Sequence, residues 1–392
     1  MTPDFIVMLI GEGNDPRRVA LAGGLESRTR NALSASGERL DVIDQDARAA
    51  LAANVPRVAV VFCRESMSDA EIDAIKMCRE GGIPIIPVVK DLTTFTQVAP
   101  KEVGKFNGFQ LADVQDVTEL AGLMLELLGL QRSKRKIFIS YARLDGRAMA
   151  QQLHDAFMAR WYSVFLDTVS IRPGEVFQES LKQELADSDV VVLLNSPAAP
   201  GRPYVEEEVT FATQARVGGV EVVWPGHGRL RQGALLMPFF LEDNHIASED
   251  EIASEDEGGK TLTPEAVLEV LRRVADLRTA QQQQRENQLV SSIEGYAQSK
   301  GFDVVPYLGR HIELRERQGA RRVRLDVVLG VPTSRDLERS FKKGDPRPPK
   351  GRLVYSRIGI TDQQAAHLNF FGAELKLDLL DPKETLQWTV LS

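Results

Sequence analysis

The stretch DVVVLLNSPAAPGRPYVEEEV, residues 189–209, runs from a wholly apolar segment through a Pro- and Gly-rich loop into an acidic helix start. The apolar segment shows no alternation of polar and apolar residues, which is typical of a strand buried on both faces of a parallel sheet. Further runs of this kind flank it: KIFIS (136–140), YSVFLD (162–167) and VEVVWP (220–225). Helical periods separate the runs, so we predict an α/β domain with a doubly wound parallel sheet of flavodoxin-like type over residues 134–280.

The helix that closes this domain is predicted to begin at Thr263, a suitable N-cap, with Pro264 at its first position. Ligands of such sheets bind at the carboxyl ends of the strands. The loops after residues 140, 167 and 195 are therefore where a site is expected.

The first 130 residues repeat the same alternation. Apolar runs occur at FIVMLIG (5–11), LDVID (40–44), RVAVVFC (57–63) and IPIIPVV (83–89), and an amphipathic helix over 116–130 closes the set. Counted back from a Gly-Gly pair, Glu71 stands ten residues before Gly81, as Glu208 stands ten before Gly218. We therefore interpret residues 1–130 as a shortened, degenerate relative of the second domain.

Length and composition indicate a soluble chain of several domains. The 392 residues are 43% hydrophobic and 27% charged, and no apolar run approaches the roughly 18–20 residues that cross a bilayer. The start lacks the features of a secretory signal, and the two cysteines do not suggest a disulfide framework. We expect a cytoplasmic protein without a membrane partner.

A polar helical linker over 281–298 is predicted to lead into a small α+β domain, residues 299–392. Residues 300–392 hold 17 Lys and Arg against 12 Asp and Glu, whereas the whole chain has a net charge of −8. This asymmetry either indicates an anionic partner for the last domain or is incidental.

One glutamate of the PYVEEEV segment is singled out by its spacing. Residues four apart share a helix face, so Tyr204 and Glu208 are expected to line one pocket. Glu206 and Glu207 are rotated from Glu208 by roughly 200° and 100°. Their charges are explained by the positive end of the helix, which favours acidic residues by roughly 0.3–1 kcal/mol each. The same explanation stays open for Glu208.

The ordered set KIFISYARLD, FLDTVSIRPG, LADSDVVVLLNSP and YVEEEV resembles the Toll/interleukin-1 receptor (TIR) domain, in particular its bacterial and NAD-consuming forms. The resemblance covers residues 134–280. It implies cleavage of the bond between nicotinamide and ribose in NAD⁺, with Glu208 as the catalytic glutamate. The family's Trp-x-x-x-Glu pattern reads Tyr204-Val-Glu-Glu-Glu208 here, with Tyr in place of Trp. NAD⁺ would be the substrate, and no cofactor is implied.

The resemblance also implies the substrate-binding residues and the partners. Ser140, Tyr141 and Arg143 would contact the nucleotide, although Arg143 could instead pair with Asp145 on the surface. Asp167, Ile171 and Gly174 would belong to the loop that gates the pocket and makes TIR–TIR contacts. We therefore expect self-association through TIR domains.

Other chemistries lack their motifs. The histidines are scattered, at 154, 227, 245, 311 and 367, and neither cysteine has a partner at metal-ligand spacing. A Gly-rich dinucleotide fingerprint, a Walker loop and a GxSxG motif are also missing from the sequence. We expect no metal site and no Rossmann dehydrogenase.

The last domain has its own resemblance, to a restriction-endonuclease-like core of the Mrr type. Asp326 could serve as its metal-binding aspartate, but the next strand, LVYSR (353–357), has no Glu-x-Lys. A binding or sensing role for a nucleic acid or protein partner is then expected, with a basic face formed by five arginines: Arg315, Arg317, Arg321, Arg322 and Arg324. An unrelated α+β interaction domain explains the same sequence.

The leading hypothesis is a TIR NAD⁺ glycohydrolase, activated by oligomerisation, that acts as a bacterial immune or antiphage effector. The biological role follows from the resemblance alone. The first alternative is a TIR scaffold without catalysis, which recruits partners through the 167–174 loop. The second makes the last domain the active part, as a nuclease or nucleic-acid-binding domain.

Overall fold

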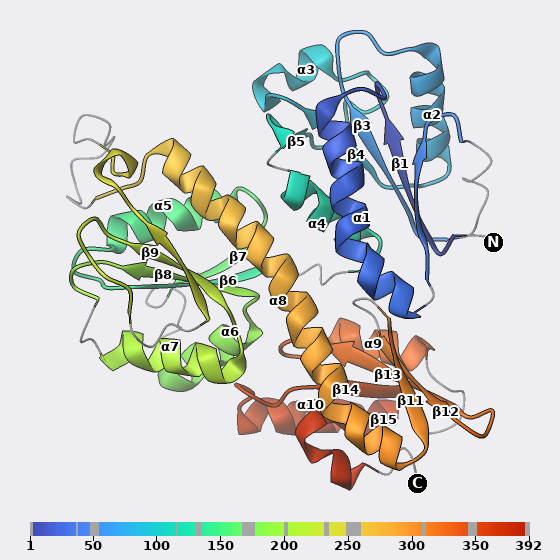
Figure 1. Ribbon diagram of the computed structural model, residues 1–392, viewed down its shortest axis with the longest axis vertical. Helices are drawn as coiled ribbons and strands as arrows, with labels where there is room; N and C mark the ends of the chain where they lie inside the picture. The colour runs from blue at the N-terminus through green and yellow to red at the C-terminus, as the bar shows by residue number, and fades with distance from the viewer. Residues whose placement is uncertain are drawn as a thin grey trace. The chain divides into compact units, whose positions relative to one another are not determined.

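The computed structural model of the chain describes residues 3–36, 38–47, 55–114, 117–130, 135–166, 177–199, 203–230, 235–247, 260–307, 311–343 and 351–388. Their strands form three sheets of five strands each (Figure 1). Among the helices of these residues, none is long and apolar enough to span a bilayer.

The first sheet is parallel throughout and has the order β2-β1-β3-β4-β5. Its strands are β1 (Phe5–Ile10), β2 (Leu40–Asp44), β3 (Arg57–Phe62), β4 (Ile85–Val89) and β5 (Phe109–Gln110). Its helices are α1 (Pro16–Ser36), α2 (Asp69–Glu80), η2 (Leu92–Thr94), α3 (Phe95–Val98) and α4 (Val117–Leu127). One apolar core packs α1 and α4 on one face, and a second packs α2 and α3 on the other.

The second sheet has the equivalent order, β10-β9-β8-β6-β7, and is also parallel. Its strands are β6 (Lys136–Tyr141), β7 (Ser163–Leu166), β8 (Val190–Asn195), β9 (Gly219–Val223) and β10 (Leu236–Phe240). The associated helices are α5 (Arg147–Met158), α6 (Phe177–Asp187), α7 (Pro203–Ala215), η4 (Asp243–His245) and α8 (Pro264–Ser299). The two predicted doubly wound sheets are thus present, with the third strand of each at its centre and the first strand beside it.

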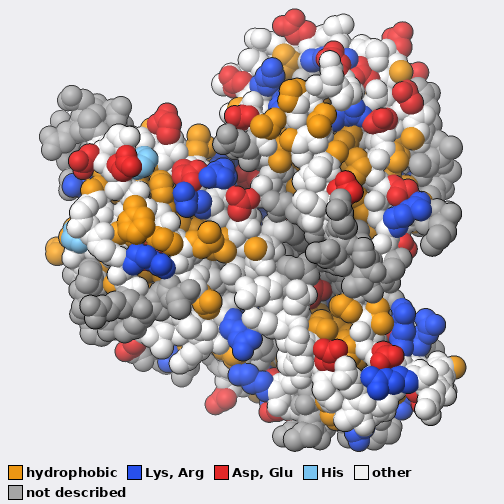
Figure 2. All heavy atoms as spheres, in the orientation of Figure 1, with side chains coloured by type: hydrophobic (Ala, Val, Ile, Leu, Met, Phe, Trp, Pro, Cys, Tyr) orange, Lys and Arg blue, Asp and Glu red, His pale blue; other side chains and the backbone are white. Residues whose placement is uncertain are grey.

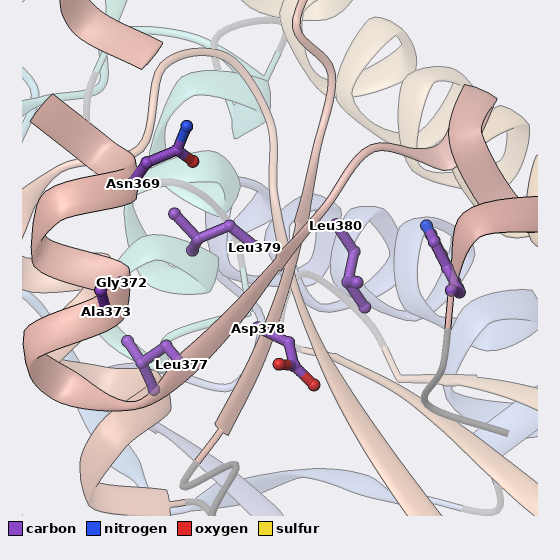
Figure 3. A pocket seen from close by; sticks show the side chains of 8 residues that line it. Asn369, Gly372, Ala373, Leu377, Asp378, Leu379 and Leu380 are labelled. Atoms are coloured by element: carbon purple, nitrogen blue, oxygen red, sulfur yellow. The ribbon is translucent and has the colours of Figure 1, made fainter. Parts of the chain in front are cut away.

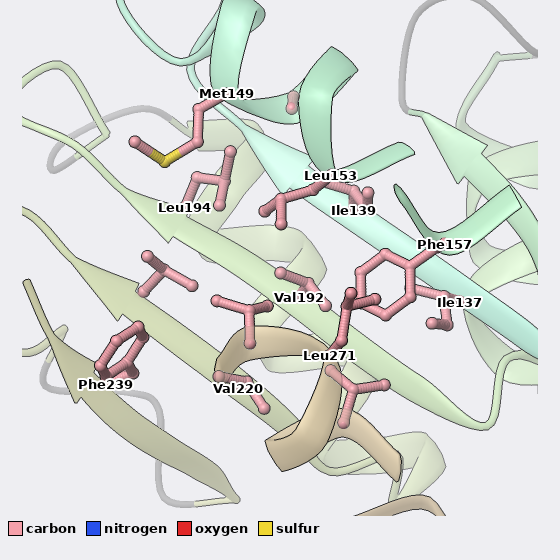
Figure 4. Close-up of a cluster of buried hydrophobic side chains, with 14 of the residues drawn as sticks. Ile137, Ile139, Met149, Leu153, Phe157, Val192, Leu194, Val220, Phe239 and Leu271 are labelled. Atoms are coloured by element: carbon pink, nitrogen blue, oxygen red, sulfur yellow. The ribbon is translucent and has the colours of Figure 1, made fainter. Parts of the chain in front are cut away.

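Two apolar layers fix the second sheet between its helices. Ile137 and Ile139 point to the face covered by α5 and α8, where they pack with Phe157 and Leu271 (Figure 4). Phe138 lies on the opposite face, toward α6 and α7, and stacks on Phe165 with ring centroids 5.3 Å apart. Burying each such side chain contributes about 1.5–3 kcal/mol. The strand β6 therefore sends alternate residues to two different cores.

The helix α8 is continuous over 36 residues. Thr263 accepts a hydrogen bond from the amide of Ala266, and Pro264 takes the first helical position, as predicted. The sequence predicts a closing helix and a polar helical linker over 281–298. In the structure, both belong to α8, which runs through that segment without a break.

The third sheet has the order β11-β12-β13-β14-β15. Its strands are β11 (Phe302–Tyr307), β12 (His311–Glu316), β13 (Arg322–Val328), β14 (Gly351–Tyr355) and β15 (Leu377–Leu380), with α9 (Ser334–Lys343), α10 (Asp362–Leu375) and η6 (Pro382–Gln387). The last three strands are parallel. The short links before β12 and β13 require antiparallel neighbours, because a parallel crossover needs a dozen or more residues. The sheet is therefore mixed.

Residues on both sides of α8 belong to one compact unit, Lys134–Val304 with Leu314–Ser392. In it, the carboxylate of Asp187 at the end of α6 accepts the amide hydrogen of Val331, 3.0 Å away, and also pairs with Lys136. Gly359 packs directly on Ala186 of α6. The third sheet therefore contacts the second domain at α6 as well as through α8.

Candidate functional site

The site begins at the carboxyl end of β6. Phe138 faces the α6/α7 core, so by strand alternation Ser140 points to the same face. Ser140 is buried, although its hydroxyl is polar. A buried hydroxyl needs a hydrogen-bond partner, and the partner is supplied by α7.

Glu208 lies on the second turn of α7 and is 3% exposed, whereas its neighbour Glu207 is exposed. This difference agrees with the predicted rotation of Glu207 away from Glu208. Ser140 Oγ donates a hydrogen bond to Glu208 Oε2. The loop after β8 and the start of α7 thus bring together two residues that stand 68 positions apart.

Tyr204 occupies the second position of α7, one turn before Glu208. The structure describes the backbone of Tyr204 but not its side chain. Asp167, Ile171 and Gly174 lie outside the described residues, so the predicted gating loop stays a prediction.

The loop after β6 is anchored by Asp145. Its two carboxylate oxygens accept hydrogen bonds from Ser196 Oγ at 2.6 Å and from the amide of Ala198 at 2.9 Å. The predicted alternative, an ion pair between Arg143 and Asp145, is not present among the described residues, and this carboxylate binds the loop after β8 instead. Arg143 is exposed and forms no ion pair within the described part of the chain. Its guanidinium is available to an anionic ligand.

Tyr141 lies on the other face of the sheet. It is buried in the core that β6 shares with α5 and α8, away from the face that carries Ser140. The structure does not bring Tyr141 together with Glu208. Strand alternation explains this, because successive residues of a strand point to opposite faces.

The corresponding place in the first domain has different chemistry. In the sheet register, Ile10 takes the place in β1 that Ser140 takes in β6, on the face that packs α2. Glu71 accepts hydrogen bonds from both terminal nitrogens of Arg64, at 2.9 and 2.8 Å, and forms a capping box with Ser68. Burial raises the pKa of Glu71, but these hydrogen bonds outweigh burial and hold the pKa below its ordinary value. Glu71 therefore serves as a helix anchor.

A second buried carboxylate was missed by sequence reasoning. Glu221 of β9 is fully buried and accepts hydrogen bonds from Asn195 Nδ2 at 2.9 Å and from the amide of Leu230 at 2.8 Å. Arg229 Nε lies 3.3 Å from its other oxygen. An acidic residue inside the run VEVVWP was the available signal, because a carboxylate in a buried strand needs partners.

The described residues contain no group of three or more His, Cys, Asp or Glu side chains arranged to hold a metal ion. His154 lies on α5 beside Asp155, with 2.8 Å between its Nδ1 and the carboxylate. The side chain is partly exposed, so His154 lies at the surface of the helix.

In the third sheet, Asp326 is buried and is bound by Arg324, whose two guanidinium nitrogens lie 3.0 and 2.6 Å from Oδ1. Arg317 pairs with Asp303 at 2.8 Å, and Arg321 lies over the ring of Phe302. These arginines have partners within their own domain. On the face seen in Figure 2, basic and acidic side chains are interspersed.

A hollow of about 210 Å³ lies at the edge strand β15 (Figure 3). Asn369 of α10, Asp378 of β15 and Trp388 are among the side chains that line it. Burial raises the pKa of Asp378, against the opposing effect of Arg352. This hollow is lined by residues that the sequence did not single out.

Comparison with known proteins finds a family model described as TIR domain that matches residues 137–248. The chain is 24% identical over 115 residues to the probable 2′ cyclic ADP-D-ribose synthase BdTIR of Brachypodium distachyon. That alignment covers 29% of this chain and 50% of the relative, so the chain spans about half the length of the curated relative that it matches.

Solved structures show more distant similarity. The TIR domains of the activated Roq1 resistosome, which recognises the pathogen effector XopQ, match with 17% identity and a TM-score of 0.23, over 24% of this chain and 60% of that one. A putative two-component response regulator/GGDEF domain protein matches with 16% identity and a TM-score of 0.31, over 69% of this chain and 98% of that one.

Proposed function

We propose, on the premise that residues 137–248 form a TIR domain, that this chain cleaves NAD⁺ between nicotinamide and ribose. The observation that supports this most directly is the buried pair of Ser140 and Glu208 at the carboxyl ends of the central strands. The curated relative named as a cyclic ADP-ribose synthase supports the same class of chemistry.

The proposed chemistry needs one carboxylate. Nicotinamide leaves NAD⁺ as a neutral molecule, so its departure requires no general acid. Positive charge develops on the ribose, and a carboxylate beside the sugar stabilises it, as in glycoside hydrolysis. Such stabilisation is strong where water is excluded. Glu208 fits this role because it is buried and its side chain is held by Ser140.

Each of the other proposed residues has a limited task. Ser140 fixes the orientation of the Glu208 carboxylate through its hydroxyl. Arg143 pairs with the pyrophosphate, for which a guanidinium is suited by its fork of donors. Tyr204, one turn before Glu208, contributes an aromatic ring to the pocket. The loop that contains Asp167, Ile171 and Gly174 borders the pocket and takes part in self-association.

The product depends on which nucleophile captures the ribose. Water gives ADP-ribose, whereas a ribose hydroxyl of the same molecule gives a cyclic ADP-ribose. An effector role in bacterial immunity, with activation by oligomerisation, belongs to the same proposal.

The test is an assay of nicotinamide and ADP-ribose products by chromatography after incubation with NAD⁺. We expect release by the wild-type chain and loss of release with Glu208→Ala. Glu207→Ala is the matched control, because its carboxylate is exposed on the same helix. Equal release from wild type and Glu208→Ala would exclude this mechanism, and no release in any oligomeric state would favour a scaffold without catalysis.

A further inference from the structure

Glu221 occupies an unusual place for a carboxylate. In the sheet register, Ser140 of β6 is beside Leu193 of β8, and Leu193 is beside Glu221 of β9. Register neighbours point to the same face, so Glu221 lies on the face that carries Ser140 and α7. Adjacent strands are about 4.8 Å apart, which puts the Cα atoms of Ser140 and Glu221 roughly 10 Å apart.

Three groups hold the Glu221 carboxylate, one from the end of β8 and two from the segment after β9. They are Asn195 Nδ2, the amide of Leu230 and Arg229 Nε. Asn195 Nδ2 also donates to the carbonyl of Gly228, at 2.9 Å. Glu221 and Asn195 together therefore fasten the segment after β9 onto the carboxyl end of β8.

This segment in turn supports the helix that carries Glu208. Leu230 packs against a cluster formed by Leu193, Val209 and Leu236. Val209 follows Glu208 directly on α7 and is itself buried. A contiguous path of contacts thus runs from Glu221 through Leu230 to the turn of α7 that contains Glu208.

We propose that Glu221 is a positioning residue for Glu208. Its carboxylate holds Leu230 against the cluster that contains Val209, and this packing fixes how far the second turn of α7 stands from Ser140. The proposal rests on the proposed NAD⁺ cleavage for its kinetic consequence, but its structural part concerns α7 alone. Substrate does not need to touch Glu221.

The physical reason for a carboxylate here is the number of donors that converge. Without Glu221, the amide of Leu230 would lose its acceptor, and Asn195 Nδ2 would keep only the carbonyl of Gly228. Polar groups left without partners away from water are destabilising. The segment would then move toward water, and Leu230 would leave the cluster that contains Val209. Glutamine keeps one carbonyl oxygen for Asn195 and Leu230, and its amide nitrogen replaces the oxygen that faces Arg229, whose exposed guanidinium can bind water instead.

The experiment compares Glu221→Ala, Glu221→Gln and Leu230→Ala with wild type, and uses Glu207→Ala as the control. We expect Glu221→Ala and Leu230→Ala to lower kcat for nicotinamide release by at least about tenfold, while KM stays within about twofold, because displacement of a catalytic group affects the chemical step. Glu221→Gln is expected to stay within about threefold of wild type. A defect that only lowers the fraction of folded chain would disappear on correction for active protein.

Amide hydrogen exchange of residues 203–215 is the second measurement and needs no activity. We expect faster exchange in the first two turns of α7 with Glu221→Ala and Leu230→Ala, and unchanged exchange with Glu207→Ala. Unchanged α7 exchange in folded Glu221→Ala would overturn the proposal, as would an unaltered kcat in that variant. If wild type releases no nicotinamide, the proposed function fails, while the exchange data still decide the role of Glu221.

Discussion

Arg64 binds Glu71 through both terminal nitrogens of its guanidinium group. In the second domain, the glutamate of the corresponding helix, Glu208, is bound by Ser140 instead. Two domains with the same strand order therefore use the glutamate of the helix after the third strand in different ways. In the first domain the carboxylate is an anchor for α2.

Replacing the two glutamates should separate stability from activity. Glu71→Ala removes charge-assisted hydrogen bonds and a capping box, so we expect the free energy of opening of the first domain to fall by about 1–3 kcal/mol. Nicotinamide release should remain as in wild type. Amide exchange of β1 and β3, measured beside the NAD⁺ assay, checks both parts. Loss of activity with intact protection of the first domain would contradict the anchoring role.

The same anchor should make the first domain sensitive to acid. The folded-state pKa of Glu71 lies below its ordinary value of 4.5, so its carboxylate contributes stability that is fully present above that value. This contribution is lost as the pH falls through the folded-state pKa. We expect the stability of wild type to decrease more steeply than that of Glu71→Gln between about pH 5 and pH 2. Parallel curves from amide exchange or urea unfolding would count against this assignment.

Gly359 and Gly301 form a matched pair for testing the contact at α6. Both have positive φ, +78° and +82°, but a Cβ on Gly359 would stand 2.3 Å from Ala186 Cβ, whereas nothing lies within 4 Å of a Cβ on Gly301. Alanine at either place costs about 1 kcal/mol for the backbone conformation. We expect Gly359→Ala to lower the free energy of unfolding by roughly 1–3 kcal/mol more than Gly301→Ala does, because the added Cβ overpacks the contact. Urea unfolding checks this, and equal effects would show that the α6 contact is loose.

Arg143 should affect substrate binding without affecting the fold. Its side chain is exposed and forms no ion pair among the described residues, so Arg143→Ala should leave the melting temperature unchanged. We expect KM for NAD⁺ to rise by about tenfold, which is the effect of losing one charge-assisted contact of roughly 1.4 kcal/mol. Arg143→Lys should recover part of the affinity. A KM for NAD⁺ equal to that of wild type in Arg143→Ala would show that Arg143 does not bind the substrate.

Thiol titration gives a test of the first core. Cys63 and Cys78 are free and buried, and burial raises the pKa of each to about 11. At pH 8 about a thousandth of each thiol is ionised, so reaction with a disulfide reagent should be slow in the native chain. Two thiols should react promptly in urea. Rapid labelling of the native chain would mean that the first domain opens readily.

The parts of the fold that follow from long apolar runs were predictable. The central strands β1, β3, β6 and β8 are almost wholly buried and show no alternation, so their sequences identify a parallel sheet. The edge strands β5 and β10 were missed. The first has two residues, and the second, LMPFF, contains Pro238 and exposes Met237 and Phe240. Short or half-exposed edges carry little periodic signal.

For the candidate site, helical spacing separated Glu208 from Glu207, but it did not identify the face on which each residue of β6 lies. Two neighbouring residues, Ser140 and Tyr141, were both expected at the nucleotide, and the pleat of the strand permits only one of them to face α7. The role of Glu221 depends on donors from the end of β8 and from the segment after β9. Contacts of this kind arise from tertiary structure, which local patterns do not encode.

Because the helix α8 is uninterrupted, it fixes the rotation of the groups attached near one end relative to those attached near the other. At 1.5 Å per residue its 36 residues form a rod about 54 Å long. One end packs in the core of the second sheet, and near the other end Tyr296 donates a hydrogen bond to the carbonyl of Trp388, at 2.6 Å. Each residue added between these ends would turn one against the other by about 100°, whereas seven added residues would nearly restore the original angle. The number of residues between the two attachments therefore fixes their relative rotation about the helix axis. An insertion would change this rotation through its length as well as through its composition.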